Sequence, residues 1–229
     1  MLKIYIGFDD VESAAWHTLV HSIYKNSRDP VCFIPLYLKN IEKIFDRPRD
    51  SNQSNSFSYS RFLVPYLSDF VGHSIYMDCD MLVTADINTL VNTIKDSKKE
   101  KAVYVVKHDY EPKNKLKYLG NKQHSYPRKN WSSFVVWNNS HPSNACLTPE
   151  LVASAAPQYL HRFQWLKDND IGELQKTWNF LVGEYEPDGD VPKNIHWTIG
   201  GPYFEDYRDA DFNELWFEYF RSMTYVKND

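Results

Sequence analysis

Two aspartates stand one residue apart at the end of an apolar run, in the segment 74–83, SIYMDCDMLV. Side chains alternate in direction along a β-strand, so Asp78 and Asp80 are expected to point to one side and Cys79 to the other. Two adjacent carboxylates repel each other unless a cation or a proton lies between them. The spacing therefore makes the end of this strand a candidate site for a divalent metal.

Other segments also end in residues that can bind a ligand. A strand-like run near the N-terminus stops at Asp9 and Asp10, and a late strand-like run contains His196. In open α/β sheets, ligands gather beyond the carboxyl ends of the strands. A carboxylate pair with an imidazole can hold Mn²⁺ or Mg²⁺ and leave positions for phosphate oxygens. We therefore expect Asp78, Asp80 and His196 to share one metal ion.

The elements that must position these residues alternate between strand and helix patterns. Strand-like runs cover 2–8, 31–38, 73–78, 101–108, 132–138 and 194–198. Helical patterns cover 11–26, 57–70, 85–99, 148–156, 171–178 and 212–223, and the segment 109–131 is polar and loop-like. This alternation predicts an α/β fold with a mostly parallel sheet flanked by helices.

Two prolines refine these expectations, and no feature of the chain suggests a division. Pro35 indicates an edge strand or an irregular position for 31–38, and Pro65 should kink or shorten the helix over 57–70. The chain shows no internal repeat and no low-complexity linker. Residues 1–229 are therefore predicted to form a single domain.

Composition narrows the classes of partner and the compartment. A net charge of −4 gives no basic surface, so nucleic acid is not expected as a partner. Cys32, Cys79 and Cys146 match no zinc pattern and no disulfide framework. The N-terminal apolar run meets Asp9 too early for a signal peptide, and no run reaches the roughly 20 apolar residues that span a bilayer. We predict a cytoplasmic protein with reduced thiols and no membrane span.

Four motifs, taken in order, resemble GT-A glycosyltransferases, and among these family 8, the group of glycogenin and related galactosyltransferases. They are IYIGFDD (4–10), FSYSRFLVPYL (57–67), YMDCDMLV (76–83) and HWTIGGPYFEDY (196–207). The resemblance implies a Rossmann-like GT-A fold. It also implies transfer of a sugar from a nucleotide donor, UDP-linked, to an acceptor that the sequence does not identify. Family 8 membership implies retention of the anomeric configuration.

The resemblance assigns roles to individual residues. It implies that Asp78, Asp80 and His196 hold Mn²⁺ (or Mg²⁺) on the donor diphosphate. It implies that further residues bind the nucleotide sugar, namely Phe8, Asp9, Asp10, Tyr59 and Arg61. Because no second carboxylate stands out as a nucleophile, we expect a same-face displacement in which the leaving phosphate acts as the base.

Two motifs depart from the family pattern. The late family motif H-x-x-G-x-x-K-P-W carries a lysine on the diphosphate, whereas residues 196–203 are shorter and contain none. The backbone N–H groups of Gly200 and Gly201 are candidates to cradle phosphate instead. In place of the family's mid-chain acidic segment, HRFQWL (161–166) offers Gln164 at the sugar site. Arg61, Gln164 and Asp80 are thus the candidate catalytic residues.

Structural explanations compete with these assignments. Arg61 alone would suit a surface ion pair, and an isolated buried histidine such as His196 is more often a satisfied core residue than a metal ligand. Asp86 is expected to begin a helix, where the helix dipole favours an acid. The alternative functions are a non-catalytic nucleotide- or sugar-binding protein with this fold, which the missing lysine favours, and a nucleotidyltransferase. The acidic GFDDVESA favours the latter less, because a basic, glycine-rich loop would be expected there.

Overall fold

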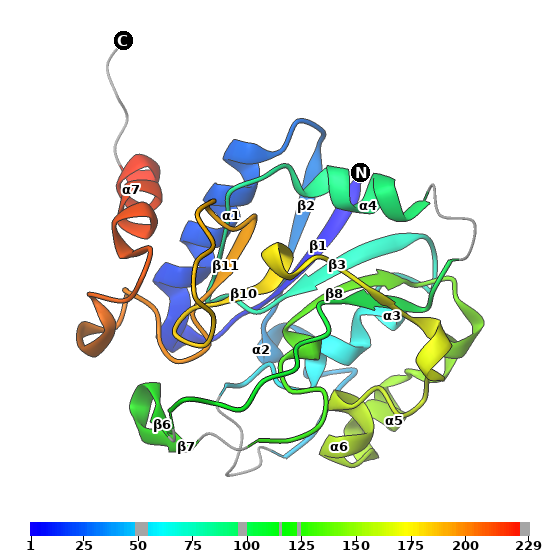
Figure 1. Ribbon diagram of the computed structural model, residues 1–229. Helices are drawn as coiled ribbons and strands as arrows, with labels where there is room; N and C mark the ends of the chain where they lie inside the picture. Colours follow the sequence, from blue (N-terminus) through cyan, green and yellow to red (C-terminus); the bar gives the residue numbers. More distant parts are fainter. Residues whose placement is uncertain (49–54, 96–99, 115, 123–124, 225–229) are drawn as a thin grey trace.

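The computed structural model describes residues 1–48, 55–95, 100–114, 116–122 and 125–224. Its main sheet has six strands in the order β2-β1-β3-β8-β5-β9 (Figure 1). These are β1 (Leu2–Gly7), β2 (Val31–Leu36), β3 (His73–Met77), β5 (Val103–Val105), β8 (Phe134–Asn138) and β9 (Ile171–Glu173). Strand β8 runs antiparallel to β3 and β5, and the other neighbouring pairs are parallel. The predicted α/β class with a mostly parallel sheet is confirmed.

A second sheet lies next to the carboxyl end of β3. It contains β4 (Met81–Val83), β10 (Phe180–Leu181) and β11 (Asn194–His196), in the order β10-β11-β4. Strand β11 pairs in parallel with β10 and antiparallel with β4. A two-stranded hairpin, β6 (Leu116–Lys117) and β7 (Asn121–Lys122), occupies part of the segment predicted as loop.

The helices surround these sheets (Figure 1). They are α1 (Ser13–Asn26), α2 (Leu38–Ile41), α3 (Val64–Leu67), α4 (Ile87–Lys95), α5 (Pro149–Ser154), α6 (Pro157–His161) and α7 (Asn213–Thr224). Short 3₁₀ helices cover Asp10–Glu12, Ser60–Leu63, Tyr118–Gly120, Trp131–Ser133, Pro142–Cys146, Asp168–Asp170, Lys176–Asn179 and Glu205–Tyr207. In the part of the chain that the structure describes, no helix has the length and apolarity needed to cross a membrane.

Prolines place two elements where the sequence indicated. Strand β2, which contains Pro35, lies at the edge of the main sheet. Proline has no backbone N–H to donate to a neighbouring strand, and an edge strand tolerates this loss. Pro65 lies in the first turn of α3, which tolerates a residue without an N–H. The helix predicted over 57–70 is accordingly reduced to a 3₁₀ turn followed by four α-helical residues.

The helix predicted over 171–178 is wrong. Its first part is strand β9, paired in parallel with β5, and its second part is the 3₁₀ turn Lys176–Asn179. A Cβ atom on Gly172 would lie 2.2 Å from the ring of Tyr104, so this strand can approach β5 only with glycine there. For the helix predicted over 85–99, residues 96–99 lie outside the described residues.

Two apolar clusters hold the sheets in place. The larger one packs around the main sheet and includes Ile4, Ile75 and Trp137, each fully buried. The smaller one joins the second sheet to α7 through Leu82, Ile195 and other residues. Helix α1 lies between β4 and α7 (Figure 1), so the second sheet is fixed against the first by packed side chains.

Candidate metal and donor site

The acid pair occupies the turn between the two sheets. Strand β3 ends at Met77 and β4 begins at Met81, so Asp78 and Asp80 lie in the turn rather than on a strand. Cys79, between them, is fully buried in the core. The three cysteines are free.

Strand pairing brings His196 to this turn. In the register of β4 and β11, His196 lies opposite Met81, one residue after Asp80. The backbone N–H of Trp197 donates to the carbonyl oxygen of Asp80 at 3.0 Å. One ligand atom from each of Asp78, Asp80 and His196 lies within 4.8 Å of the others. The structure thus brings together the three residues predicted to share a metal.

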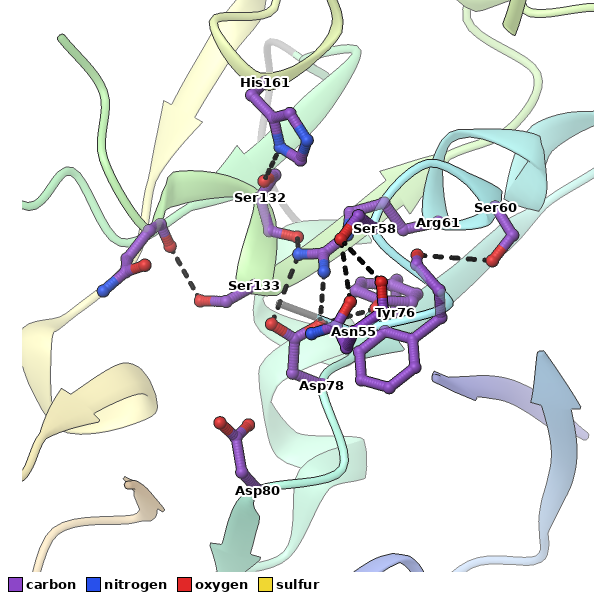
Figure 2. Close-up of polar contacts among 12 residues, drawn as sticks. Asn55, Ser58, Ser60, Arg61, Tyr76, Asp78, Asp80, Ser132, Ser133 and His161 are labelled. Carbon is purple, nitrogen blue, oxygen red and sulfur yellow. Dashed lines mark hydrogen bonds and ion pairs between the residues drawn. The ribbon is translucent and has the colours of Figure 1, made fainter. Parts of the chain in front are cut away.

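Asp78 is fixed by a buried ion pair with Arg61 (Figure 2). The Arg61 Nη2 and Nη1 atoms lie 2.9 and 3.3 Å from the two carboxylate oxygens, and the Tyr76 hydroxyl donates to Oδ1 at 2.5 Å. Arg61 Nη1 also donates to the carbonyl oxygen of Ser132 at 2.9 Å. Burial raises the pKa of the Asp78 carboxyl, and the adjacent guanidinium charge opposes that rise. The surface ion pair considered for Arg61 is therefore wrong: the pair is buried.

Asp80 has an unmet requirement for a positive partner. Its Oδ1 is buried without a hydrogen bond among the described residues and lies 3.3 Å from Nε2 of His196. Figure 2 likewise draws no contact for Asp80 among the residues shown. A buried oxygen without a partner is costly, and a carboxylate oxygen beside an imidazole nitrogen is a ligand set that suits Mn²⁺. The residues present therefore fit a divalent cation.

The orientation of His196 favours the same conclusion. Its Nδ1 lies 2.8 Å from Oδ1 of Asn179. The Ser133 hydroxyl donates to the carbonyl oxygen of Asn130 at 2.7 Å, so it accepts from the Asn179 amide nitrogen at 2.9 Å, and the amide oxygen is the atom that faces the ring. An oxygen accepts only from a protonated nitrogen, so Nδ1 carries the proton in neutral His196. The lone pair of Nε2 then points at Asp80, as a metal ligand requires.

A third acidic side chain lies close to the pair. Glu12 is buried, and its Oε1 accepts from the Tyr203 hydroxyl at 2.7 Å. Burial and then the charge of Asp80 raise the pKa of Glu12 to about 8. Both causes favour the neutral form of the Glu12 carboxyl over its anion.

A cavity of about 430 Å³ opens from this acidic wall, a volume typical of small-ligand pockets. Arg61, Asp78, Asp80 and His196 line it together with Tyr59. The remaining lining residues are Asn55, Ser58, Lys117, Tyr118, Tyr126, Asn130, Ser132, Ser133, Pro157, Gln158, His161, Arg162 and Thr198. Most of these side chains are polar and uncharged, so the cavity can bind a highly hydroxylated ligand through hydrogen bonds.

Gln164 is not brought to this cavity. Its side chain is exposed and absent from the lining, whereas Gln158 on α6 lies in the wall. Helix α6 ends at His161, and the positive φ of Phe163 turns the chain so that Phe163 enters the core. The neighbouring Trp165 packs against that core. The structure does not support a donor contact for Gln164.

The residues after β1 form the turn that begins α1. Asp9 Oδ1 accepts from the backbone N–H of Val11 at 3.2 Å, and Oδ2 accepts from that of Ser56 at 3.1 Å. Phe8 packs edge-on against Trp16 and Tyr37, and the Tyr37 hydroxyl donates to exposed Asp10. Phe8, Asp9 and Asp10 are absent from the described cavity lining, so their nucleoside contacts stay a prediction.

The two late glycines are required by packing. A Cβ atom on Gly200 would lie 2.6 Å from the ring of Tyr207, and one on Gly201 would lie 2.3 Å from that of Tyr203. The N–H of Gly200 donates to the carbonyl oxygen of Trp197 at 3.0 Å. That N–H is engaged in a turn, so the predicted phosphate cradle is not supported at Gly200.

Several site residues carried no clear signal in the sequence. Lys117 lies among other lysines in a segment read as loop, and nothing distinguishes it from its neighbours. Asn179 follows a segment that was predicted as helix. Glu12 is the last acid of the run after β1, and the sequence predicted donor contacts for Asp9 and Asp10 of that run instead. The cap that Asp9 provides to the 3₁₀ turn Asp10–Glu12 leaves Asp10 exposed and Glu12 buried.

One further expectation, for Asp86, and one histidine, His21, concern residues outside the site. Asp86 Oδ1 accepts from the backbone N–H of Asn88 at 3.0 Å, just before α4, which confirms its predicted place at a helix start. His21 Nε2 forms a hydrogen bond of 2.9 Å with the Ser222 hydroxyl of α7, a structural contact.

Comparison with known proteins yields one relative at high identity. The chain is 42% identical over 221 residues to Protein CDI of Arabidopsis thaliana, a match that covers 93% of this chain and 84% of that protein. No protein-family model matches the chain.

Solved structures with a similar fold are glycosyltransferases. Glycosyltransferase GlyE of Streptococcus pneumoniae has a TM-score of 0.61 at 14% identity, and the match covers 97% of this chain but 61% of GlyE. The galactosyltransferase LgtC, solved with donor and acceptor sugar analogues, has a TM-score of 0.60 at 13% identity, with 99% and 98% coverage. Mouse xyloside xylosyltransferase 1 has a TM-score of 0.52 at 12% identity, and the match covers 86% of this chain and 97% of that protein. This likeness identifies the fold as that of GT-A glycosyltransferases.

Proposed function

We propose that this chain, which belongs to the Protein CDI family, is a metal-dependent glycosyltransferase that moves a sugar from a UDP-linked donor to an acceptor. The observation that carries the proposal is the buried, unpartnered Asp80 oxygen, which faces the Nε2 lone pair of His196 at the wall of a polar cavity. A GT-A fold with this arrangement favours a nucleotide sugar as the ligand. Family 8 membership and a cytoplasmic location stay predictions.

Asp80 and His196 would hold the metal, with Asp78 beside them. Both oxygens of Asp78 already accept from Arg61, so its lone pairs are partly engaged, whereas those of Asp80 and His196 face the cavity. The metal, Mn²⁺ or Mg²⁺, would neutralise charge that develops on the leaving diphosphate. Arg61 would fix the position of Asp78 and present its remaining surface to the donor.

The cavity lining favours retention without a covalent intermediate. Among its described residues, the only carboxylates are Asp78 and Asp80, and both belong to the metal site. Neither is then free to attack the anomeric carbon. A same-face displacement, in which the acceptor hydroxyl gives its proton to the leaving phosphate, therefore suits this cavity. Tyr59 and Gln158, which also line the cavity, are candidates to contact the sugar.

One observation favours the non-catalytic alternative. Residues 196–203 contain no lysine, and the Gly200 N–H is engaged, so this loop supplies few donors to a diphosphate. A protein that binds a nucleotide sugar without transferring it would need less stabilisation of the leaving group. Measurements of binding and of turnover therefore test different parts of the proposal.

UDP is expected to raise the thermal unfolding temperature of the protein when Mn²⁺ is present, and not when the metal is removed. A ligand that binds only the folded state stabilises it by about 2.7 kcal/mol at a hundredfold excess over its dissociation constant. The metal links the diphosphate to Asp80 and His196, so chelation should abolish that stabilisation. Thermal unfolding with UDP and Mn²⁺, compared with UDP and excess chelator, measures this.

The control is the same pair of scans without nucleotide, which separates any effect of Mn²⁺ alone. Equal stabilisation by UDP in excess chelator would remove the bridging metal from the proposed function. An effect of other nucleoside diphosphates as large as that of UDP would remove the preference for uridine.

A further inference from the structure

Lys117 reaches the cavity from a segment far from the acid pair in sequence. It ends strand β6 and lines the cavity with Asp78 and Asp80. The next residue anchors it: the N–H of Tyr118 donates to the carbonyl oxygen of Ile199 at 2.7 Å, and its ring stacks on Phe204 at 5.0 Å. Lys117 is therefore held against the loop that follows His196, the loop that contains no cation of its own.

The charge of Lys117 is incompletely compensated. In the described part of the chain, no ion pair joins Lys117 to a carboxylate. Its ammonium nitrogen lies 5.6 Å from the centroid of the Tyr118 ring. Burial lowers the pKa of Lys117, and the charges of Asp80 and Asp78 oppose that change. Burial and then the charge of Lys117 lower the pKa of Lys129 to about 8, so a second amine lies nearby.

Charge balance indicates what this wall would bind. Asp78 and Asp80, the carboxylates of the described lining, supply two negative charges. Arg61, a divalent cation and Lys117 would together supply four positive charges. Two positive charges then remain in a partly buried site, where unpaired charge is costly. The diphosphate of a sugar nucleotide carries two negative charges and would balance them.

We propose that Lys117, in the lining of the same cavity as the candidate metal ligands, binds the diphosphate of the donor in place of a lysine in the late loop. The inference rests on the proposed function for the identity of the donor. It assigns Lys117 a contact with the leaving group itself, where an ammonium–phosphate hydrogen bond strengthens as negative charge develops.

Inorganic pyrophosphate tests this contact without a nucleoside or sugar. Calorimetric titration with pyrophosphate and Mn²⁺ should show binding to the wild-type protein. Lys117→Ala should weaken that binding by about tenfold to a hundredfold, the range for a hydrogen bond to a charged group. Lys117→Arg, which keeps the positive charge, should retain most of the affinity. The affinity for Mn²⁺ alone should not fall in either variant.

Lys113→Ala is the matched control, because Lys113 lies on the same segment but pairs with exposed Glu186 outside the cavity. It should bind manganese pyrophosphate as the wild type does, and thermal unfolding checks that each variant is folded. Absence of pyrophosphate binding in the wild type, or equal binding in folded Lys117→Ala, would overturn the inference. If the protein turns over a sugar nucleotide but its pyrophosphate binding does not depend on Lys117, the inference is overturned and the proposed function stands. If pyrophosphate binding depends on Lys117 but no sugar nucleotide is turned over, the inference stands and the proposed function is overturned.

Discussion

Replacement of Asp80 by asparagine should lower donor turnover by at least about a hundredfold while the fold survives. The substitution keeps the shape of the side chain but removes one negative charge from the metal site. Because Asp80 Oδ1 has no hydrogen bond among the described residues, no internal hydrogen bond of that atom is lost with the charge. The loss resembles that of one preorganised electrostatic contact in an active site. Steady-state turnover of a UDP-sugar and Mn²⁺ titration of the same protein measure the effect.

Asp86→Asn provides the matched control for this variant. Asp86 is an aspartate of the same region, but it caps the start of α4 and lies outside the cavity lining. It should retain wild-type turnover, since its carboxylate accepts from the backbone N–H and the side-chain amide of Asn88, which lies outside the cavity lining as well. Turnover of Asp80→Asn within a few-fold of wild type would mean that the acid pair is only a structural turn.

Arg61→Ala should be the most destabilising single change at the site, with a loss of about 3–5 kcal/mol in the free energy of unfolding. The side chains of Arg61 and Asp78 are 6% and 11% exposed, so removal of the guanidinium leaves a buried carboxylate without its partner. It also leaves the carbonyl oxygen of Ser132 without that donor. Urea unfolding at pH 7, without metal or nucleotide, measures the loss.

A double variant tests the cause of this loss. If the uncompensated charge is responsible, Arg61→Ala combined with Asp78→Asn should be more stable than Arg61→Ala alone. Lys113→Ala breaks an ion pair in which the side chains of Lys113 and Glu186 are 50% and 87% exposed. It should lower the free energy of unfolding by about 0–1 kcal/mol. A loss in Arg61→Ala no larger than that of Lys113→Ala would contradict the buried-pair account.

The fold could be predicted where residue patterns reflect local physics. The apolar spacing of α1, the edge position of Pro35 and the acids at the end of β3 each depend on short-range chemistry that the sequence displays. The helix expected over 171–178 failed because pairing with β5 decided the conformation there. In that pairing the ring of Tyr104 packs over Gly172. Because these two residues are distant in sequence, no local pattern predicts the contact.

The candidate metal ligands were predictable from the sequence, whereas the surroundings of the site were less so. Asp78 and Asp80 follow β3, His196 is the last residue of β11, and strand ends converge in this class of fold. Lys117, Asn179 and other wall residues come from short turns whose direction is set by tertiary contacts. The bond from Tyr118 to Ile199 is one such contact, and no spacing rule anticipates it.

Release of UDP from a panel of sugar nucleotides tests the central claim most directly. The measurement uses the wild-type protein with Mn²⁺, the same mixture with excess chelator, and Asp80→Asn with Mn²⁺. The account predicts UDP release from at least one sugar nucleotide, slowly when water is the only acceptor, and loss of that release under both control conditions. Metal-dependent binding of UDP without release from any member of the panel would contradict the account and identify a binding protein with this fold.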